Sequence, residues 1–388
     1  MNPDSDDYRL FVAIFVERKT YLNMKYIKYL TLTLIFILNL SSCKSKDVDY
    51  LEKDVILGNI TRVADYELNH PSTHDQDLDY DYKNGWIPAT FYVSLVPLYE
   101  ATSDSKYLEA VKAWGAKTEW DLAPRFRHAD DIVCGQVYLD FYRHEREPVY
   151  INKLKIRMDS LIATKVPGRE DWSWCDALFM APPVYMMAGN ILNEEKYTKY
   201  ADEMYWDVYD FLFDQEESLF YRDERFFTQK SPNGSKLFWG RGNGWVLGGL
   251  ARMIPYIKDE TMKERYVSLF KKMSEKIITL QQEDNMWRSN LLDADHWAQK
   301  ESSGSAFYVY ALTWGINNGI LESDKYGPIV EKSWKALSEC INQETGMIGW
   351  VQPIGASPGD TKATTTFSYG AGAYVLAGVE MLTYIKNK

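Results

Sequence analysis

The sequence is poor in the residues on which several common functions depend. Only 5 of its 388 residues are histidine and 4 are cysteine, and neither type follows the spacing of a zinc site or of an H-E-x-x-H motif. A phosphate-binding glycine loop and a Ser-His-Asp pattern are also absent. The net charge of −11 provides no basic face for nucleic acid. These absences argue against metallopeptidases, nucleotide-dependent enzymes, serine hydrolases and nucleic-acid-binding proteins.

Long apolar runs are scarce too, and the run near the N-terminus is too short to span a bilayer comfortably. From Met24 the chain reads MKYIKYLTLTLIFILNLSSC, with two lysines, an apolar stretch over residues 30–38 and then LSSC, which resembles a lipobox. The pattern predicts an over-called start plus a lipoprotein signal peptide over residues 1–43, with lipidation of Cys43. A plain secretory signal is the alternative. We expect residues 44–388 to form a single catalytic domain, lipid-anchored in the periplasm or at the outer membrane.

The three remaining cysteines are Cys134, Cys175 and Cys340. Three thiols cannot all pair within one chain, and we expect them to be buried. Cys134 and Cys175 could approach each other, which the spacing leaves open.

Aromatic residues are plentiful, at 15% of the chain with 13 Trp and 28 Tyr. They are interpreted mainly as core, with several in a cleft where flat rings can stack on sugars.

After residue 50 the chain alternates between two kinds of helical segment. One kind is amphipathic, with charges opposite the apolar face. These segments cover residues 51–66, 105–117, 151–165, 194–212, 262–280 and 327–341.

The other kind of segment is apolar nearly all round and rich in Gly, Ala and aromatic residues, so it must be surrounded by protein. These segments cover residues 85–101, 129–142, 174–192, 242–257, 303–316 and 367–385. An irregular repeat of helical hairpins follows, with six buried helices ringed by six amphipathic ones. The fold class predicted is all-α, an (α/α)6 barrel, with an open helical solenoid as the alternative. A β-like patch over residues 218–227 is interpreted as a hairpin or loop at the rim.

Each apolar segment is preceded or opened by polar and aromatic residues. Because hairpins alternate in direction, the apolar helices should all start at one mouth of the barrel. Helix N-termini carry unpaired N–H groups and about half a positive charge each, which favours an anionic ligand. Six clusters should therefore meet there, namely YDYKNGW (80–86), RHADD (127–131), DWSWCD (171–176), WGRGNGW (239–245), ESSGSA (301–306) and TTTFSYG (364–370).

The cluster WGRGNGW offers a planar fork at Arg241, between glycines and beside Trp239 and Trp245. An arginine fork matches a carboxylate, glycines let the backbone approach a ligand, and indoles provide stacking faces. A sugar acid fits all three features. The alternative is a glycine-rich helix entry in which Arg241 pairs with a structural aspartate.

The candidate catalysts are carboxylates. Asp176 opens an apolar segment beside tryptophans, and Asp130 and Asp131 open another. An aspartate at a helix start is often only a cap, worth about 1 kcal/mol. A proton donor at neutral pH requires burial or a second carboxylate to raise the pKa against the helix dipole. His128 could contact a ligand or simply lie on the rim.

At this point HADDIVCGQ, WSWCDALFMAPP, WGRGNGW, SSGSAFYVYAL and FSYGAGAYVLAG together resemble the unsaturated rhamnogalacturonyl hydrolases of glycoside hydrolase family 105, from about residue 55 onward. Family 88, the unsaturated glucuronyl hydrolases, is related. The resemblance implies an (α/α)6 barrel and removal of a 4,5-unsaturated uronic acid, with galacturonate as the expected sugar, from the non-reducing end of lyase-generated oligosaccharides such as rhamnogalacturonan fragments. It also implies hydration of the C4=C5 bond, with no metal or organic cofactor.

By the same resemblance Asp176 is the general acid/base and Asp130 the second carboxylate. Asp131 is kept as an alternative to Asp130. The substrate-binding candidates are Asp131, Trp86, His128, Trp174, Trp239, Arg241, Asn243 and Trp245.

One stretch departs from the family pattern. In LFYRDE (219–224) many relatives carry a histidine, where this chain has Arg222 and Asp223. The substrate subtype is therefore open, and unsaturated glucuronyl ends of other polysaccharides are an alternative. A lyase or isomerase using His128 or Tyr82 as base, and a non-catalytic glycan-binding lipoprotein, are the other hypotheses.

Overall fold

The computed structural model describes residues 48–71 and 83–388. The predicted signal peptide with Cys43, and Tyr82, lie outside the described residues. The chain divides into two units, Met1–Asp49 and Tyr50–Lys388, and the description below concerns the second. No helix within the described ranges has the length and apolarity needed to cross a membrane.

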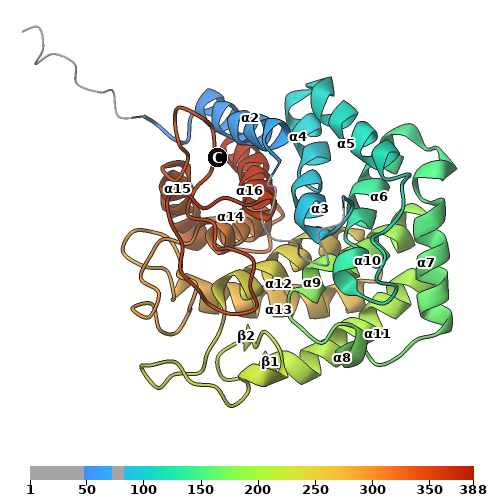
Figure 1. Ribbon diagram of the computed structural model, residues 1–388. Coiled ribbons are helices and arrows are strands. Elements are labelled where there is room, and N and C mark those ends of the chain that lie inside the picture. Colours follow the sequence, from blue (N-terminus) through green and yellow to red (C-terminus); the bar gives the residue numbers. More distant parts are fainter. Residues whose placement is uncertain (1–47, 72–82) are drawn as a thin grey trace, which may run out of the picture. The chain divides into compact units, whose positions relative to one another are not determined.

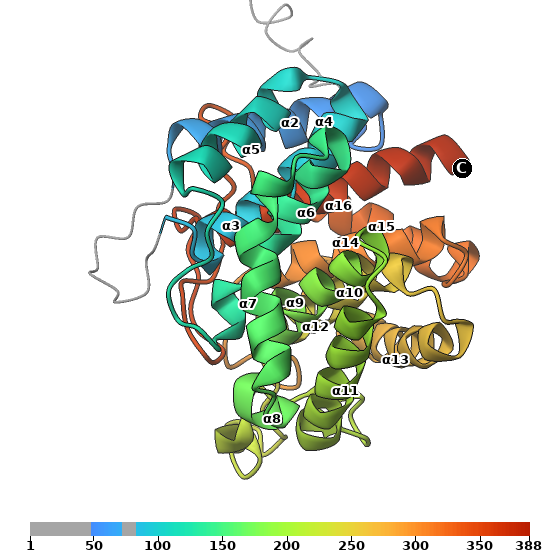
Figure 2. The same cartoon turned by 90° about the vertical axis from the view of Figure 1, so that its right-hand side faces the viewer.

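A closed ring of helices forms the inside of this unit (Figure 1, Figure 2). Each inner helix contacts the next, and the last contacts the first, so the barrel is closed and the open-solenoid alternative is excluded. The ring closes because its helices are apolar on all sides. The helices α12 and α14, for example, are buried along nearly their whole length and need protein on every side. In the described part of the chain the inner helices are α3 (Trp86–Tyr92) with its continuation α4 (Leu95–Thr102), α6 (Cys134–Glu145), α10 (Pro182–Ile191), α12 (Gly240–Met253), α14 (Ser302–Asn317) and α16 (Ser368–Asn387).

The outer helices are amphipathic, as their sequences predict. The helix α11, for example, buries Tyr197, Ala201, Met204 and Val208 on one face at spacings of three or four residues. Aspartates cap two of the helices, since Asp104 and Asp259 each accept a backbone N–H of the first turn. In the same ranges the outer set is α2 (Lys53–Asn69), α5 (Ser105–Lys117), α7 (Asn152–Ala163), α11 (Glu195–Leu212), α13 (Glu260–Ile278) and α15 (Ser323–Ser338).

Two inner helices begin less regularly than predicted. The segment expected over residues 129–142 starts with a short 3-10 turn, η1 (Ala129–Asp131), before α6. The segment expected over 174–192 divides into α9 (Ala177–Met180) and α10. Proline at the start of α10 lacks the backbone N–H that a continuous helix requires. These irregular starts leave Asp130 and Asp176 ahead of the long helices, at one end of the barrel.

The helices α9 and α12 approach each other very closely. A Cβ atom on Gly249 would lie 2.4 Å from the carbonyl oxygen of Leu178, so only glycine fits. A buried ion pair ties α12 to α6, where Arg252 donates to Asp140 at 2.7 Å. Together these contacts fix the helices that carry the polar clusters relative to one another.

The β-like patch contributes one strand to a very short hairpin and continues as a loop. Strand β1 (Phe213–Asp214) pairs antiparallel with β2 (Leu219–Phe220), with Phe213 opposite Phe220. The chain then makes a 3-10 turn, η3 (Glu224–Phe226). Further short turns are α8 (Gly168–Asp171), η2 (Pro148–Tyr150) and η4 (Ile254–Tyr256).

Candidate active site

A cavity of about 380 Å³ lies at the end of the barrel where inner helices begin. Its wall comes from the starts of α3 and α12, from η1 and from the turn before α9. The predicted meeting of polar clusters is thus observed for these four inner segments. Of the predicted site residues, those that line the cavity are Trp86, His128, Asp130, Trp174, Asp176, Trp239, Arg241 and Trp245.

Asp130 and Asp176 are brought together in this cavity. Burial, and after it the charge of Asp176, raise the pKa of Asp130 to about 7 against the opposing effect of Arg125. Burial also raises the pKa of Asp176, while Arg222, the Cys175 thiol and Arg241 oppose the rise. Two neighbouring carboxyl groups with raised pKa values share protons as a pair. Asp130 can therefore carry a proton close to neutral pH in the same cavity as Asp176.

The Cys175 side chain lies directly beside Asp176. Its Sγ donates to Asp176 Oδ1 at 3.2 Å, and burial raises the pKa of this thiol well above its usual range. All three described cysteines are buried free thiols, as predicted, so Cys134 and Cys175 do not pair. A Cβ on Gly242 would lie 3.0 Å from this sulfur and 3.5 Å from Asp176 Oδ1. The glycine of WGRGNGW therefore leaves room for the carboxylate and its thiol partner.

His128 forms part of the aromatic wall. Its ring packs on Trp174 with centroids 4.6 Å apart, and its Nδ1 lies 3.6 Å from Asp130 Oδ2. Burial and the nearby Arg125 lower the pKa of His128 to about 4. The imidazole is thus neutral at pH 7 and can accept or donate a hydrogen bond.

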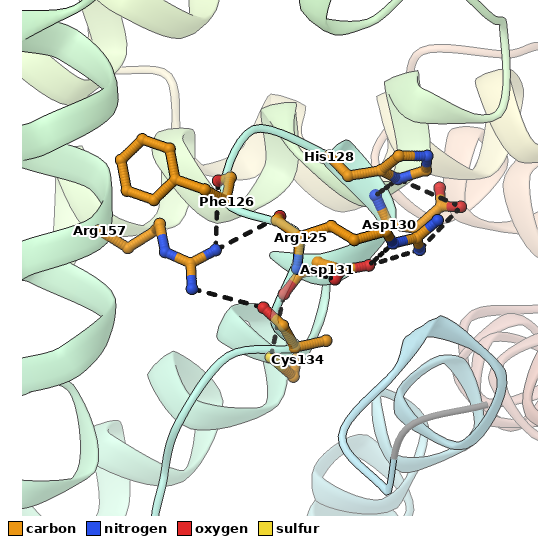
Figure 3. A network of polar contacts seen from close by, with 8 residues as sticks. Arg125, Phe126, His128, Asp130, Asp131, Cys134 and Arg157 are labelled. Atoms are coloured by element: carbon orange, nitrogen blue, oxygen red, sulfur yellow. Dashed lines mark hydrogen bonds and ion pairs between the residues drawn. The ribbon is translucent and has the colours of Figure 1, made fainter. Parts of the chain in front are cut away.

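Asp131 lies outside the cavity, contrary to its place among the candidates. Its carboxylate is fully buried and accepts from the Arg125 backbone N–H at 2.7 Å and from the Arg125 guanidinium at 2.9 and 2.5 Å. Figure 3 shows Arg125 between the two aspartates, bonded to Asp131 and reaching toward Asp130. In the 3-10 turn η1 the side chain of Asp130 faces the cavity, whereas that of Asp131 points into the protein interior. Arg125 was not predicted, and it lies two residues before the predicted cluster at residues 127–131.

The guanidinium of Arg241 is not free to bind a carboxylate, as the sequence suggested it would be. Its two terminal nitrogens donate to the carbonyl oxygens of Gln352 at 2.5 Å and Pro353 at 3.0 Å. The guanidinium also stacks between the rings of Trp239 and Tyr369, at 4.6 and 4.7 Å. Its partners are carbonyls rather than the structural aspartate considered as the alternative. Arg241 lines the cavity mainly as an anchor for residues 351–361, hereafter the 351–361 loop.

The 351–361 loop forms one side of the cavity through Ile354, Gly355 and Ala356. The indole N–H of Trp239 holds it by donating to Gln352 Oε1 at 2.8 Å. This loop carried no sequence signal, and Met180, which also lines the cavity, lies in the motif WSWCDALFMAPP but was not named as a site residue. Backbone-lined walls of this kind have no characteristic residue pattern.

Asn243 also lies outside the cavity, where it holds the hairpin. Its amide accepts from the backbone N–H of Phe220 at 2.8 Å and donates to the carbonyl of Phe220 at 3.0 Å. The cluster at residues 301–306 likewise lies outside the cavity. Its Glu301 is buried and caps α14. Arg222 does line the cavity, and its departure from the family pattern was the only signal for it.

Comparisons with known proteins bear on this site. A family model described as Glycosyl Hydrolase Family 88 matches residues 59–385. The unsaturated 3S-rhamnoglycuronyl hydrolase of Formosa agariphila is 38% identical over 317 residues, covering 76% of this chain and 84% of that protein.

Two solved structures superpose closely. A family 88 glycosyl hydrolase from Bacteroides vulgatus has a TM-score of 0.78 at 28% identity, over 85% of this chain and 99% of the other. A protein described as a polysaccharide lyase has a TM-score of 0.78 at 32% identity, over 86% and 98%. The resemblance found in the sequence motifs is confirmed.

Proposed function

The chain belongs to glycosyl hydrolase family 88, and from that premise we propose that it removes a 4,5-unsaturated uronic acid from the non-reducing end of lyase-generated oligosaccharides. The observation that carries the proposal is the pair Asp130 and Asp176, buried together in an aromatic-walled cavity. The pair supplies the acid and the base that hydration of a double bond requires.

In the proposed reaction the enzyme adds water across C4=C5. Asp176 delivers a proton to C4 and assists attack of water at C5, and Asp130 holds the second carboxyl position of the pair. The hydroxyl at C5 makes a hemiketal, which opens and releases the neighbouring sugar. Because no displacement occurs at the anomeric carbon, the carboxylate spacing does not report retention or inversion. Trp86, Trp174 and Trp245 provide flat faces for the sugar ring.

The substrate subtype is set mainly by the leaving sugar. Glucuronic and galacturonic acids differ only at C4, and 4,5-elimination removes that centre, so both give the same unsaturated residue. The Formosa relative is named for a rhamnoglycuronyl substrate, and the motifs resemble rhamnogalacturonyl hydrolases. We therefore propose rhamnose as the leaving sugar, in fragments of rhamnogalacturonan or of a rhamnose-containing glucuronan.

The test follows absorbance near 235 nm, where conjugated unsaturated uronates absorb. We expect it to fall with lyase-generated oligosaccharides of rhamnogalacturonan or ulvan, and less with those of polygalacturonate or chondroitin. Asp176→Asn should lower kcat by about 10²–10⁴-fold, whereas Asp210→Asn, on the exposed face of α11, should leave it unchanged. If folded Asp176→Asn keeps full activity, the proposed mechanism is wrong.

A lyase activity is the second candidate, favoured by the 32% identical structure described as a polysaccharide lyase. A lyase needs a base for the proton at C5, and neutral His128 beside Trp174 is available for that role. The two reactions have opposite signatures, because a lyase creates absorbance near 235 nm and the hydrolase removes it. Binding of an oligosaccharide with no change in absorbance would indicate a non-catalytic glycan-binding protein.

We further propose that Cys43 is lipidated and anchors the protein in the periplasm or at the outer membrane. The support is the signal-like stretch from Met24 ending in LSSC. Labelled palmitate should enter the wild-type protein and not Cys43→Ser, which should be released in soluble form. Labelling of Cys43→Ser equal to wild type would contradict the assignment.

A further inference from the structure

We infer that Arg222 is the anion-recognising residue of this cavity, contacting an oxyanion of the substrate. The inference rests on the proposed function and adds a residue that the family motifs do not supply. The oxyanion is either the carboxylate of the unsaturated uronate or a sulfate ester on the neighbouring sugar. Both present the oxygen geometry that an arginine fork binds.

The backbone fixes the position of Arg222 from two sides. Its carbonyl oxygen accepts from the Cys175 N–H at 2.8 Å, which joins it to the turn carrying Asp176. Two residues earlier, Asn243 holds both the N–H and the carbonyl of Phe220. Arg222 is therefore placed by the turn that carries Asp176 and by α12, and a preorganised donor binds at lower entropic cost.

The Arg222 side chain retains capacity to bind. It lines the cavity at 20% exposure, and its NH1 atom donates to Asp223 at 2.7 Å. Its Nε is buried without a hydrogen-bond partner within the described residues, so a ligand in the cavity would meet the exposed part of the guanidinium instead. Asp223 also accepts two bonds from Arg225, at 2.8 and 2.7 Å. One carboxylate thus serves two guanidinium groups, and the Arg222 guanidinium also feels the charge of Asp176 across the cavity.

The other two cavity arginines already make hydrogen bonds inside the protein, although the buried Nε of Arg241, like that of Arg222, has no partner within the described residues. Arg125 forms a tight pair with Asp131, and the terminal nitrogens of Arg241 donate to the carbonyls of the 351–361 loop. An anionic substrate must also approach the acidic Asp130 and Asp176 pair. Arg222 lies near enough to Asp176 to lower its pKa, so its charge also offsets the repulsion that an incoming anion would meet there.

Arg225 provides a matched control. It bonds to the same Asp223, but its side chain is 63% exposed and does not line the cavity. We expect Arg222→Gln to raise KM by about 10- to 100-fold, the value of hydrogen bonds to a charged group, with Arg225→Gln within about twofold of wild type. Arg222→Lys keeps the charge but not the planar guanidinium, so its KM should lie between those of wild type and Arg222→Gln. This variant keeps the test valid if Arg222→Gln does not fold.

The same variants are assayed on an unsaturated uronyl-rhamnose with and without a sulfate on the rhamnose. A loss confined to the sulfated substrate identifies sulfate as the ligand, and an equal loss on both identifies the uronate carboxylate. If Arg222→Gln matches Arg225→Gln in KM, or if only the pH profile of kcat moves, the inference is wrong. If wild type turns over neither substrate, the proposed function fails. Arg222 is then tested by tryptophan fluorescence titration with the same oligosaccharides, where Arg222→Gln must bind more weakly than Arg225→Gln.

Discussion

Replacing Asp130 by asparagine should stabilise the folded protein in a pH-dependent way. The pKa of Asp130 is raised from its ordinary value of 3.8 to about 7. One pKa unit is worth about 1.4 kcal/mol, so ionising Asp130 in the folded state costs about 4 kcal/mol. The side chain is 17% exposed, which makes this value an upper limit. Asparagine has a similar shape and carries no charge, so the variant does not bear this cost.

The sign follows from proton uptake. Between about pH 4 and pH 7 the folded protein holds a proton on Asp130 that the unfolded chain has lost, so stability falls as pH rises. The advantage of Asp130→Asn should be near zero at pH 4, grow to about 4 kcal/mol at pH 7 and stay constant above it. The groups whose charges act on Asp130 are Asp176, Arg125, Asp131 and Arg222. The assay is urea unfolding of both proteins at several pH values, together with activity, which the variant should lose.

Asp131→Asn is the adjacent control and should behave in the opposite way. Its carboxylate is fully buried and bonded to Arg125, so its removal should destabilise the protein by about 3–5 kcal/mol at neutral pH. Destabilisation by Asp130→Asn, or a stabilisation that does not change with pH, would refute the reasoning.

Two other substitutions test the surroundings of the carboxyl pair. Cys175→Ala removes the donor to Asp176 Oδ1 and should move the kcat–pH profile upward, while Cys175→Ser, a stronger donor, should move it downward; identical profiles would show that the thiol has no influence. Arg241→Lys loses one of two carbonyl contacts and the stacking on Trp239, so the 351–361 loop should exchange amide hydrogens faster and be cleaved sooner by protease. Unchanged protection with a raised KM would instead mean that Arg241 contacts substrate, as its sequence suggested.

The helices were predictable because their signals are local. The amphipathic pattern over residues 105–117 coincides with α5, and the apolar segment 303–316 lies within α14. A pattern that repeats every three or four residues reports which face is buried, whatever the helix packs against. Alternation of the two patterns then indicated a ring, which the contact of α16 with α3 closes.

The site was harder to predict where partners are distant or belong to the backbone. Arg241 was expected to bind a carboxylate, but its terminal nitrogens donate to the carbonyl oxygens of Gln352 and Pro353. A backbone carbonyl has no sequence signature. Asp130 and Asp131 are neighbours with the same chemistry, and only the turn of η1 separates their environments. In both cases the deciding contact depends on packing between segments far apart in the chain.

The closed ring also determines when this site can exist. Trp86 opens the first inner helix, and Ile354 lies just ahead of the last, yet both form the same cavity. A nascent chain that has made α3 through α14 still lacks the 351–361 loop and the helix that seals the seam. Contacts of such long sequence separation form late and slowly. A chain that ends before residue 351 therefore lacks one side of the cavity.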